Sequence, residues 1–336
     1  MKLTVDCAFN FSDIATSEQA QHLQGLSFLL SRANKIKRQK ITLDSVVSQA
    51  FGLQATPDLP MAAMSALGDG LEVQNAVWFY ADPVHFLLQR DTFSLHDEAP
   101  LNLSSAHTEY LLNILNQHFS DDGLQFLRGQ SGRWYLKILE NAEMFWPIET
   151  KPLQSVIGQD VQATMPKGQA ALQWRKMLNE IQMLLHEHPV NQAREKNGEL
   201  AVSSIWVSGG GELQLKSVFQ VREEVLLAEH PLYAGVACLA QKKYLPLQEI
   251  EAVIHQKKCD AVRMRLESKD LVHPMIFASS WWVFFVECLK KCNIHRLVFN
   301  IGLHDMTLTA EISLFDLFKF WRKTKPVSEF FVGKKV

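Results

Sequence analysis

Three polar residues around a proline offer the most specific chemistry in this sequence. His188, Asn191 and Arg194 lie in the segment HPVNQAR, where an arginine fork and a neutral asparagine donor could hold one phosphate or carboxylate group. Because Pro189 disfavours helical backbone at His188, we expect the chain to turn there and to present these side chains on a short segment ending near Gly198. The same three residues could instead brace the fold, with His188 capping the helix before it.

A run of three glycines follows a predicted strand, Ser203 to Ser208. Gly209, Gly210 and Gly211 would let backbone amides approach an anion with no side chain in the way, which is the chemistry of a phosphate-cradling turn. A tight turn that binds nothing explains the run as well.

Four further polar residues lie in an earlier region rich in aromatic residues. Asp82 and His85 flank a proline in a predicted strand, and irregular backbone of this kind often aims functional groups. Arg133, together with Arg90, could form an anion patch. The alternatives are a hydrogen-bonded staple for Asp82 and His85, and for Arg133 a salt bridge lying over a core tryptophan.

A helix from Gln169 to Glu187 is predicted to position the first group. Its apolar residues recur at steps of three and four, which is typical of a helix with one buried face. The predicted buried stripe consists of Trp174, Met177, Leu178, Ile181, Leu184 and Leu185. The opposite, solvated face carries Arg175, Lys176, Asn179, Glu180 and Gln182.

The hydrophobic patterns predict two parts of different texture. Around a helix from Ser105 to Phe119, strand patterns occur in the order ββαββ, so we expect residues 76–164 to form an inserted module. Strands alternate with helices in the remainder, so 1–75 and 165–336 should form one discontinuous α/β core with a mixed sheet.

Two charged or aromatic stretches lie near the ends of this core. The run RANKIKRQK, residues 32–40, is interpreted as a solvated basic end, because no aromatic residues alternate with its charges as in a nucleic-acid site. The segment LFDLFKFWRK is predicted to form a short helix with Leu314, Leu317, Phe318 and Trp321 on one side.

Composition limits the class of protein. The chain has 336 residues, 47% of them hydrophobic, and a formal net charge of −2, which gives no overall attraction for nucleic acid or an anionic membrane. Five scattered cysteines with no C-x-x-C pair indicate free thiols in a reducing compartment. No signal-like segment is recognised at the N-terminus, and the most apolar stretch is too short to span a bilayer. We therefore expect a cytoplasmic protein, with neither a membrane nor nucleic acid as its partner.

Five blocks carry a resemblance to known families. They read PMAAMSALGDG, WFYADPVHFLLQRD, LNQHFSDDGLQFLRGQSGRWYLKI, LNEIQMLLHEHPVNQAR and SSIWVSGGG. Their order resembles the bacterial RpfE-type regulatory protein family, and the last two are similar to a region of the archaeal-type cofactor-independent phosphoglycerate mutases of the alkaline-phosphatase superfamily. The resemblance implies a phosphatase-like α/β core with an inserted α+β module.

The sequence departs from the catalytic pattern of those mutases, which use two metal ions, an Asp-Gly pair after the first strand, a nucleophilic serine and a late Asp-x-x-Gly-His motif. Asp6 and Asp13 have no adjoining glycine. None of the late histidines, His255, His273, His295 and His304, stands in the required motif, although His304-Asp305 could be a remnant. Because the metal clamp for phosphoryl transfer is not recognised, we expect no catalytic residue, bound metal or cofactor.

Three functions follow from this comparison. The leading hypothesis is a regulatory protein that binds a small phosphorylated or carboxylate ligand, or a protein partner, without catalysis. The alternative is an active metal-dependent phosphoglycerate mutase or phosphohydrolase whose ligands occur at unfamiliar spacings. In the third, the chain is an interaction scaffold and the HPVN segment only braces the fold.

Overall fold

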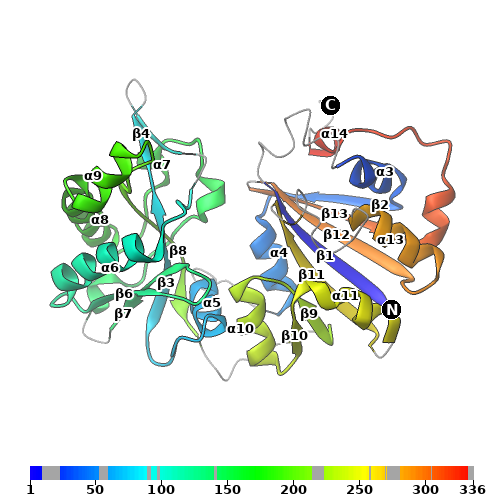
Figure 1. Ribbon diagram of the computed structural model, residues 1–336, viewed down its shortest axis with the longest axis horizontal. Coiled ribbons are helices and arrows are strands. Elements are labelled where there is room, and N and C mark those ends of the chain that lie inside the picture. Colours follow the sequence, from blue (N-terminus) through cyan, green and yellow to red (C-terminus); the bar gives the residue numbers. More distant parts are fainter. Residues whose placement is uncertain are drawn as a thin grey trace. The chain divides into compact units, whose positions relative to one another are not determined.

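The computed structural model describes residues 1–9, 23–52, 60–88, 92–96, 99–139, 142–213, 223–256, 259–268, 270, 281–303 and 305–331. These residues form a mixed α/β protein of two compact units (Figure 1). The first unit comprises Met1–Leu53, Val218–Tyr233 and Ala237–Val336, and the second comprises Gln54–Ser217 and Ala234–Val236.

The first unit is built on a seven-stranded mixed sheet in the order β10-β9-β11-β1-β12-β13-β2. The first five strands in this order are parallel, and β13 and β2 are antiparallel to their neighbours. The strands are β1 (Lys2–Phe9), β2 (Lys35–Gln39), β9 (Val225–Leu227), β10 (Lys243–Leu245), β11 (Ala261–Glu267), β12 (Arg296–Leu303) and β13 (Met306–Ile312). The mixed sheet confirms the predicted fold class.

Helices connect these strands and cover the sheet. The helical segments are α3 (Gln24–Arg32), α4 (Leu43–Ala50), α10 (Pro231–Ala240), η3 (Leu247–Glu249), α11 (Ile250–Gln256), α13 (Trp281–Lys290), η4 (Leu314–Phe318) and α14 (Val327–Phe331). Because side chains alternate along a strand, Leu3, Val5 and Cys7 of β1 face the main core, which α3, α11 and α13 complete. Thr4 and Asp6 point to the opposite face, where α4 contacts β1 and β12.

The second unit is built on a four-stranded antiparallel sheet in the order β6-β7-β3-β8. Its strands are β3 (Val77–Val84), β6 (Leu124–Arg128), β7 (Trp134–Ile138) and β8 (Ser204–Glu212), and a separate hairpin joins β4 (Phe86–Leu88) to β5 (Phe93–Leu95). The helical segments are α5 (Met61–Gly68), α6 (Ser105–Phe119), η1 (Glu143–Phe145), η2 (Leu153–Ser155), α7 (Val161–Thr164), α8 (Ala171–His186) and α9 (Pro189–Lys196).

Helices α6 and α8 supply much of the core of this unit. The predicted stripe of α8 is buried at Trp174, Met177, Leu178, Ile181 and Leu185, and Leu184 is half-buried. Trp174 Nε1 donates to the Phe145 carbonyl at 2.8 Å, so the indole is buried without losing its hydrogen bond. The three- and four-residue spacing of apolar residues in the sequence therefore predicted the positions of both α6 and α8.

The observed boundaries of the units differ from the predicted ones. Residues 165–213 were assigned to the core, but β8 pairs with β3 from Val84↔Ser204 to Val77↔Glu212 and completes the smaller sheet. Helix α8 packs on the same sheet through β8. The second unit therefore includes α8, α9 and β8, whose membership depends on long-range strand pairing rather than on local pattern.

The predicted apolar stripe at the end of the chain is correct only in part: Leu314 and Leu317 are half-buried, and Leu317 packs against the main core. The segment forms a short 3₁₀ helix, η4, and the side chains of Phe318 and Trp321 are exposed, not packed. Within the described ranges, no helix is both long enough and apolar enough to cross a bilayer.

Burial of Ile181 can be tested by substitution. Ile181→Asp places an unpaired charge at a position with no exposure, so we expect a loss of more than about 3 kcal/mol in unfolding free energy. Met183→Asp is the matched control, because Met183 lies on the same helix and is 77% exposed. Urea unfolding measures both variants, and equal stability of the two would contradict the packing of α8.

Candidate functional site

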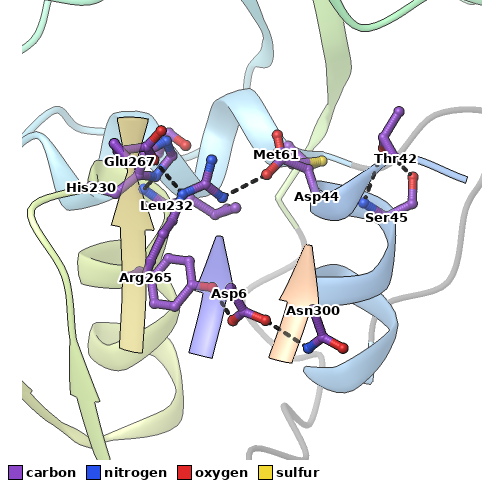
Figure 2. Close-up of polar contacts among 12 residues, drawn as sticks. Asp6, Thr42, Asp44, Ser45, Met61, His230, Leu232, Arg265, Glu267 and Asn300 are labelled. Carbon is purple, nitrogen blue, oxygen red and sulfur yellow. Dashed lines mark hydrogen bonds and ion pairs between the residues drawn. The ribbon is translucent and has the colours of Figure 1, made fainter. Parts of the chain in front are cut away.

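A buried carboxylate occupies the centre of the larger sheet. Asp6 on β1 is fully buried and accepts hydrogen bonds from Arg263 Nε at 2.6 Å and Arg263 Nη2 at 3.0 Å. Asn300 Nδ2 donates to Asp6 Oδ1 at 2.7 Å (Figure 2), and the Tyr233 hydroxyl also donates to this carboxylate. Both oxygens of Asp6 are therefore fully used within the protein.

Strand register brings these donors together. Asp6 is aligned with Asn300 on the neighbouring β12, whose amide oxygen accepts from Thr309 Oγ1 of β13 at 2.9 Å. Arg263 is aligned with Thr4, two residues before Asp6 and therefore on the same face of the sheet. Burial, followed by the Asp6 charge, raises the pKa of Tyr233 well above its ordinary value, so the hydroxyl remains a donor.

A second arginine lies further along β11. Arg265 donates to Glu267 Oε1 at 2.5 Å and to Asp44 Oδ1 at 2.7 Å, and Asp44 lies in the first turn of α4. Figure 2 shows Arg265 beside Glu267 and, at the start of α4, the Thr42–Ser45 cap.

The charge of this cluster does not favour an anion. Glu223 approaches Arg263 Nη1 at 3.5 Å, so Arg263 and Arg265 face four carboxylates in total. The formal charge of the cluster is about −2 if all six groups are ionised.

The described residues do not fit the two metal ions that the family resemblance implies. The carboxylate of Asp6 is already neutralised by a guanidinium and two neutral donors, whereas a metal ligand needs a free oxygen lone pair. In the part of the chain that the structure describes, no group of three or more His, Cys, Asp and Glu side chains could hold an ion. Asp13, His273 and His304 lie outside the described residues.

The HPVN segment forms a closed elbow. His188 caps the helix after it and not, as predicted, the helix before it: it is the N-cap of α9, and its Nδ1 accepts from the Val190 amide at 3.2 Å. Burial lowers the pKa of His188, which favours the neutral ring that this cap requires. The structure confirms the turn at His188 and shows that the short segment after it is a two-turn helix.

Asn191 and Arg194 point into this elbow. Asn191 Nδ2 donates to the carbonyls of Leu185 at 2.7 Å and Val202 at 2.9 Å, and its Oδ1 accepts from the Val202 amide at 2.8 Å. Arg194 donates through Nε to the Leu200 carbonyl at 2.7 Å and pairs with Glu199 at 3.1 Å. These contacts support the bracing interpretation, because they use the groups that an anion would need.

The three glycines are part of β8 and do not form a turn after it. A Cβ on Gly210 would lie 2.0 Å from the Phe79 ring, and one on Gly211 would lie 2.9 Å from Pro60. Gly209 has φ +64 and lies where the β3–β8 register shifts between Trp78 and Tyr80. Close packing and a β-bulge therefore explain the run, which corrects the predicted turn.

Asp82 on β3 meets Arg133, the residue immediately before the adjacent strand β7. Arg133 donates to both oxygens of Asp82, at 3.1 Å and 2.9 Å, and its guanidinium lies 3.6 Å from the centre of the Tyr80 ring. Asp82 is buried, so this pair matches the staple interpretation, and Arg133 forms the predicted salt bridge, although it lies over the Tyr80 ring and not over a tryptophan. His85 makes a separate contact, from Nδ1 to the Ala201 carbonyl at 2.8 Å, and Arg90 lies outside the described residues.

A pocket in the second unit combines apolar walls with unused polar groups. It has a volume of about 410 Å³, within the ordinary range of ligand sites. Its described lining consists of Phe86, Phe93, Val161, Gln162, Met165, Arg175, Asn179 and Gln182. Among the described residues, the lining contains one cation, three amides and no carboxylate, which suits an anionic group attached to an apolar one.

The sequence assigned three of these residues to the solvated face of a helix. Arg175, Asn179 and Gln182 recur at steps of four and three, so they share one face of α8. None of the three forms a side-chain hydrogen bond or ion pair with another described residue. The predicted solvated face is confirmed for Arg175 and Asn179, which are exposed, and Gln182 is half-buried. The position of the β4–β5 hairpin, which forms another wall of the pocket, could not be predicted from sequence.

Short elements hold the other walls of this pocket. The Phe86 and Phe93 ring centres are 6.4 Å apart across the β4–β5 hairpin. An isolated bridge between Ser94 and Asp160 ties this hairpin to the start of α7, where Asp160 accepts from the Gln162 amide at 3.0 Å. The pocket therefore lies among α7, α8 and the hairpin.

Comparison with known proteins links the chain to phosphoglycerate mutases by sequence similarity. It is 23% identical over 217 residues to a probable 2,3-bisphosphoglycerate-independent phosphoglycerate mutase of Geobacter sulfurreducens, covering 62% of this chain and 54% of the relative. The corresponding enzyme of Methanosarcina mazei is 26% identical over 134 residues, covering 39% of this chain and 33% of the relative. The chain spans about half the length of the first of these relatives.

Among solved structures, the cofactor-independent phosphoglycerate mutase of Thermoplasma acidophilum is similar with a TM-score of 0.44 and 15% identity, over 98% of this chain and 95% of that one. No family model matches the chain. The mutase part of the sequence resemblance is therefore matched by curated relatives, whereas the regulatory-family part remains a prediction.

The Asp6–Arg263 pair can be tested by removing its cation. Arg263→Met leaves the buried Asp6 charge without its partner, so we expect a loss of about 3–5 kcal/mol in unfolding free energy. Asp6→Asn in the same chain should restore part of that loss. Lys291→Met, which removes an exposed pair with Glu287, should change stability by less than about 1 kcal/mol. Denaturant unfolding of the parent and the three variants measures these changes. An Arg263→Met variant as stable as the parent would refute the network.

The elbow can be tested for bracing against anion binding. Arg194→Ala should lower the melting temperature, since it removes two contacts of a buried guanidinium worth about 1–3 kcal/mol together. Lys196→Ala, at an exposed position of the same helix, is the control. Thermal shifts with and without phosphate complete the test. A phosphate response that disappears in Arg194→Ala, with folding unchanged, would instead favour the anion site.

Proposed function

We propose that this chain is a binding protein for a small organic anion, which it holds without chemical conversion. The ligand class is a carboxylate or phosphate attached to an apolar group, as in the leading sequence hypothesis. The α8 pocket carries this proposal, because Arg175 supplies a positive charge, three amides supply neutral donors, and Phe86, Phe93, Val161 and Met165 supply an apolar surface.

Each group has a separate task. Arg175 would pair with the anionic group through two parallel donors, and Asn179 and Gln182, on the same helix face, would donate to its remaining oxygens. The phenylalanine pair would cover the apolar part and exclude water from it. Regulation would then follow from occupancy of the pocket, through a downstream partner.

The buried Asp6 network supports the absence of turnover. A phosphoryl-transfer site needs positive charge that is free to stabilise the transferred group, and Arg263 and Arg265 are both engaged by carboxylates.

Phosphoglycerate mutase activity is the second candidate, favoured by the sequence similarity to curated mutases. Metal analysis and an assay with 3-phosphoglycerate and added Mn²⁺ separate the two candidates. Two equivalents of bound metal with turnover would establish the enzyme and remove the binding-only proposal.

The pocket can be probed with phenyl phosphate, which joins an aromatic ring to an anion. We expect phenyl phosphate to raise the melting temperature more than inorganic phosphate or benzyl alcohol does, because each of these offers only half of the contacts. In calorimetry, Arg175→Gln should weaken phenyl phosphate by about 1.5–3 kcal/mol, the range for hydrogen bonds to charged groups.

Lys176→Gln is the matched control, since Lys176 is the next residue of α8 and does not line the pocket. Its affinity for phenyl phosphate should equal that of the parent. The proposal fails if phenyl phosphate leaves the parent's melting temperature unchanged, or if both variants bind it equally well.

A further inference from the structure

A second and larger pocket lies at one end of the four-stranded sheet of the second unit. It has a volume of about 820 Å³. Its lining includes Asn75, Val77, Ile138, Leu139, Trp146 and Glu212. Among the described residues, this lining contains one carboxylate, one amide and one indole, and it contains no lysine, arginine or histidine. The groups present therefore suit a cation, whereas those of the α8 pocket suit an anion.

Strand register places the carboxylate beside an apolar surface. Glu212 at the end of β8 and Ile138 at the end of β7 are both aligned with Val77 of β3. Because residues directly opposite each other on antiparallel strands lie on the same face of the sheet, the Glu212 side chain lies on the face that carries Val77 and Ile138. Both of these apolar residues belong to the core of the second unit. Charge and apolar surface are therefore adjacent in this pocket.

An aromatic wall completes the pocket. The Phe79 ring covers Gly210, which lies two residues before Glu212 on β8. Trp146 packs against Phe79 with their ring centres 5.8 Å apart at 65°. Trp146 is only half-buried and lines the pocket, so part of its indole is open to a ligand. Among aromatic side chains, tryptophan attracts a cation most strongly.

The polar groups of this pocket have no structural task within the described protein. Asn75, Trp146 and Glu212 form no side-chain hydrogen bond or ion pair with another described residue. Asn75 and Glu212 are also exposed, so both can reach a ligand without loss of an existing contact. This distinguishes the pocket from the His188–Arg194 elbow, where hydrogen bonds within the protein already use the polar groups.

We propose that this pocket binds a small organic ammonium ion, in which a primary ammonium group is attached to an apolar group. Glu212 pairs with the ammonium group, Asn75 Oδ1 accepts from one of its other N–H groups, and the Trp146 ring attracts the charge. Val77 and Ile138 cover the apolar part. The pocket shares no described lining residue with the α8 pocket, so this proposal does not rest on the anion ligand proposed above.

Calorimetry of the full chain with 2-phenylethylammonium tests this proposal. We expect the parent to bind this ion, and to bind 2-phenylethanol, which has the same apolar part and no charge, at least about tenfold more weakly. Glu212→Gln keeps the size of the side chain but removes its charge, and it should weaken 2-phenylethylammonium at least about tenfold. Because Glu212 is exposed, its melting temperature should equal that of the parent.

A second variant tests the amide. Asn75 has φ +53, a left-handed conformation that glycine adopts without strain. Asn75→Gly therefore removes the amide group and keeps the backbone, and it should weaken 2-phenylethylammonium about threefold.

Glu109→Gln is the matched control, because Glu109 is an exposed glutamate of α6 that does not line the pocket. It should bind 2-phenylethylammonium like the parent. Arg175→Gln should also leave this binding unchanged, and Glu212→Gln should leave the binding of phenyl phosphate unchanged. These two cross-tests distinguish a failure of the cation site from a failure of the α8 anion site.

Three outcomes would overturn the proposal. In the first, the parent does not bind 2-phenylethylammonium, or it binds 2-phenylethanol equally well. In the second, Glu212→Gln binds the ion as tightly as the parent does. In the third, Arg175→Gln loses the ion and Glu212→Gln retains it, which assigns the ion to the α8 pocket.

Discussion

The larger sheet depends on the neutralisation of one carboxylate. Asp6 lies on the central parallel strand with no exposure, where an unpaired charge would cost far more than the free energy that holds a typical domain together. Arg263, Asn300 and Tyr233 come from three different elements and all bond to this group. The network therefore ties β11, β12 and α10 to β1, and it also determines chemistry, because a carboxylate in this state is not available as a ligand.

The sequence predicted features that depend on neighbouring residues. Helix α6 spans the predicted Ser105 to Phe119, and α8 lies within two residues of its predicted bounds, because three- and four-residue periodicity is a local property. The turn at His188 followed in the same way from the restriction that Pro189 imposes on the residue before it. The mixed α/β class required only the alternation of strand and helix patterns.

Contacts between distant residues could not be predicted in this way. Arg263 and Asp6 are 257 positions apart, and nothing in the segment AVRMRLE shows that its first arginine is buried against a carboxylate. The glycine run was assigned to a ligand-binding turn because the sequence does not show the Phe79 ring that occupies the space above Gly210. For the same reason the sequence placed Arg175, Asn179 and Gln182 on a solvated face, which the exposure of Arg175 and Asn179 confirms, but it did not show that the β4–β5 hairpin forms a pocket beside them.

The larger sheet combines strands from both ends of the chain, and this has a consequence for the order in which the protein forms during synthesis. The central strand β1 is made first, but its neighbours β11 and β12 follow more than 250 residues later, so the closing of this sheet must await nearly the whole chain. The four-stranded sheet, by contrast, uses strands that lie between residues 77 and 212. On the ribosome the smaller sheet can therefore pair while β1 still has no partner, and during that interval the Asp6 side chain remains hydrated.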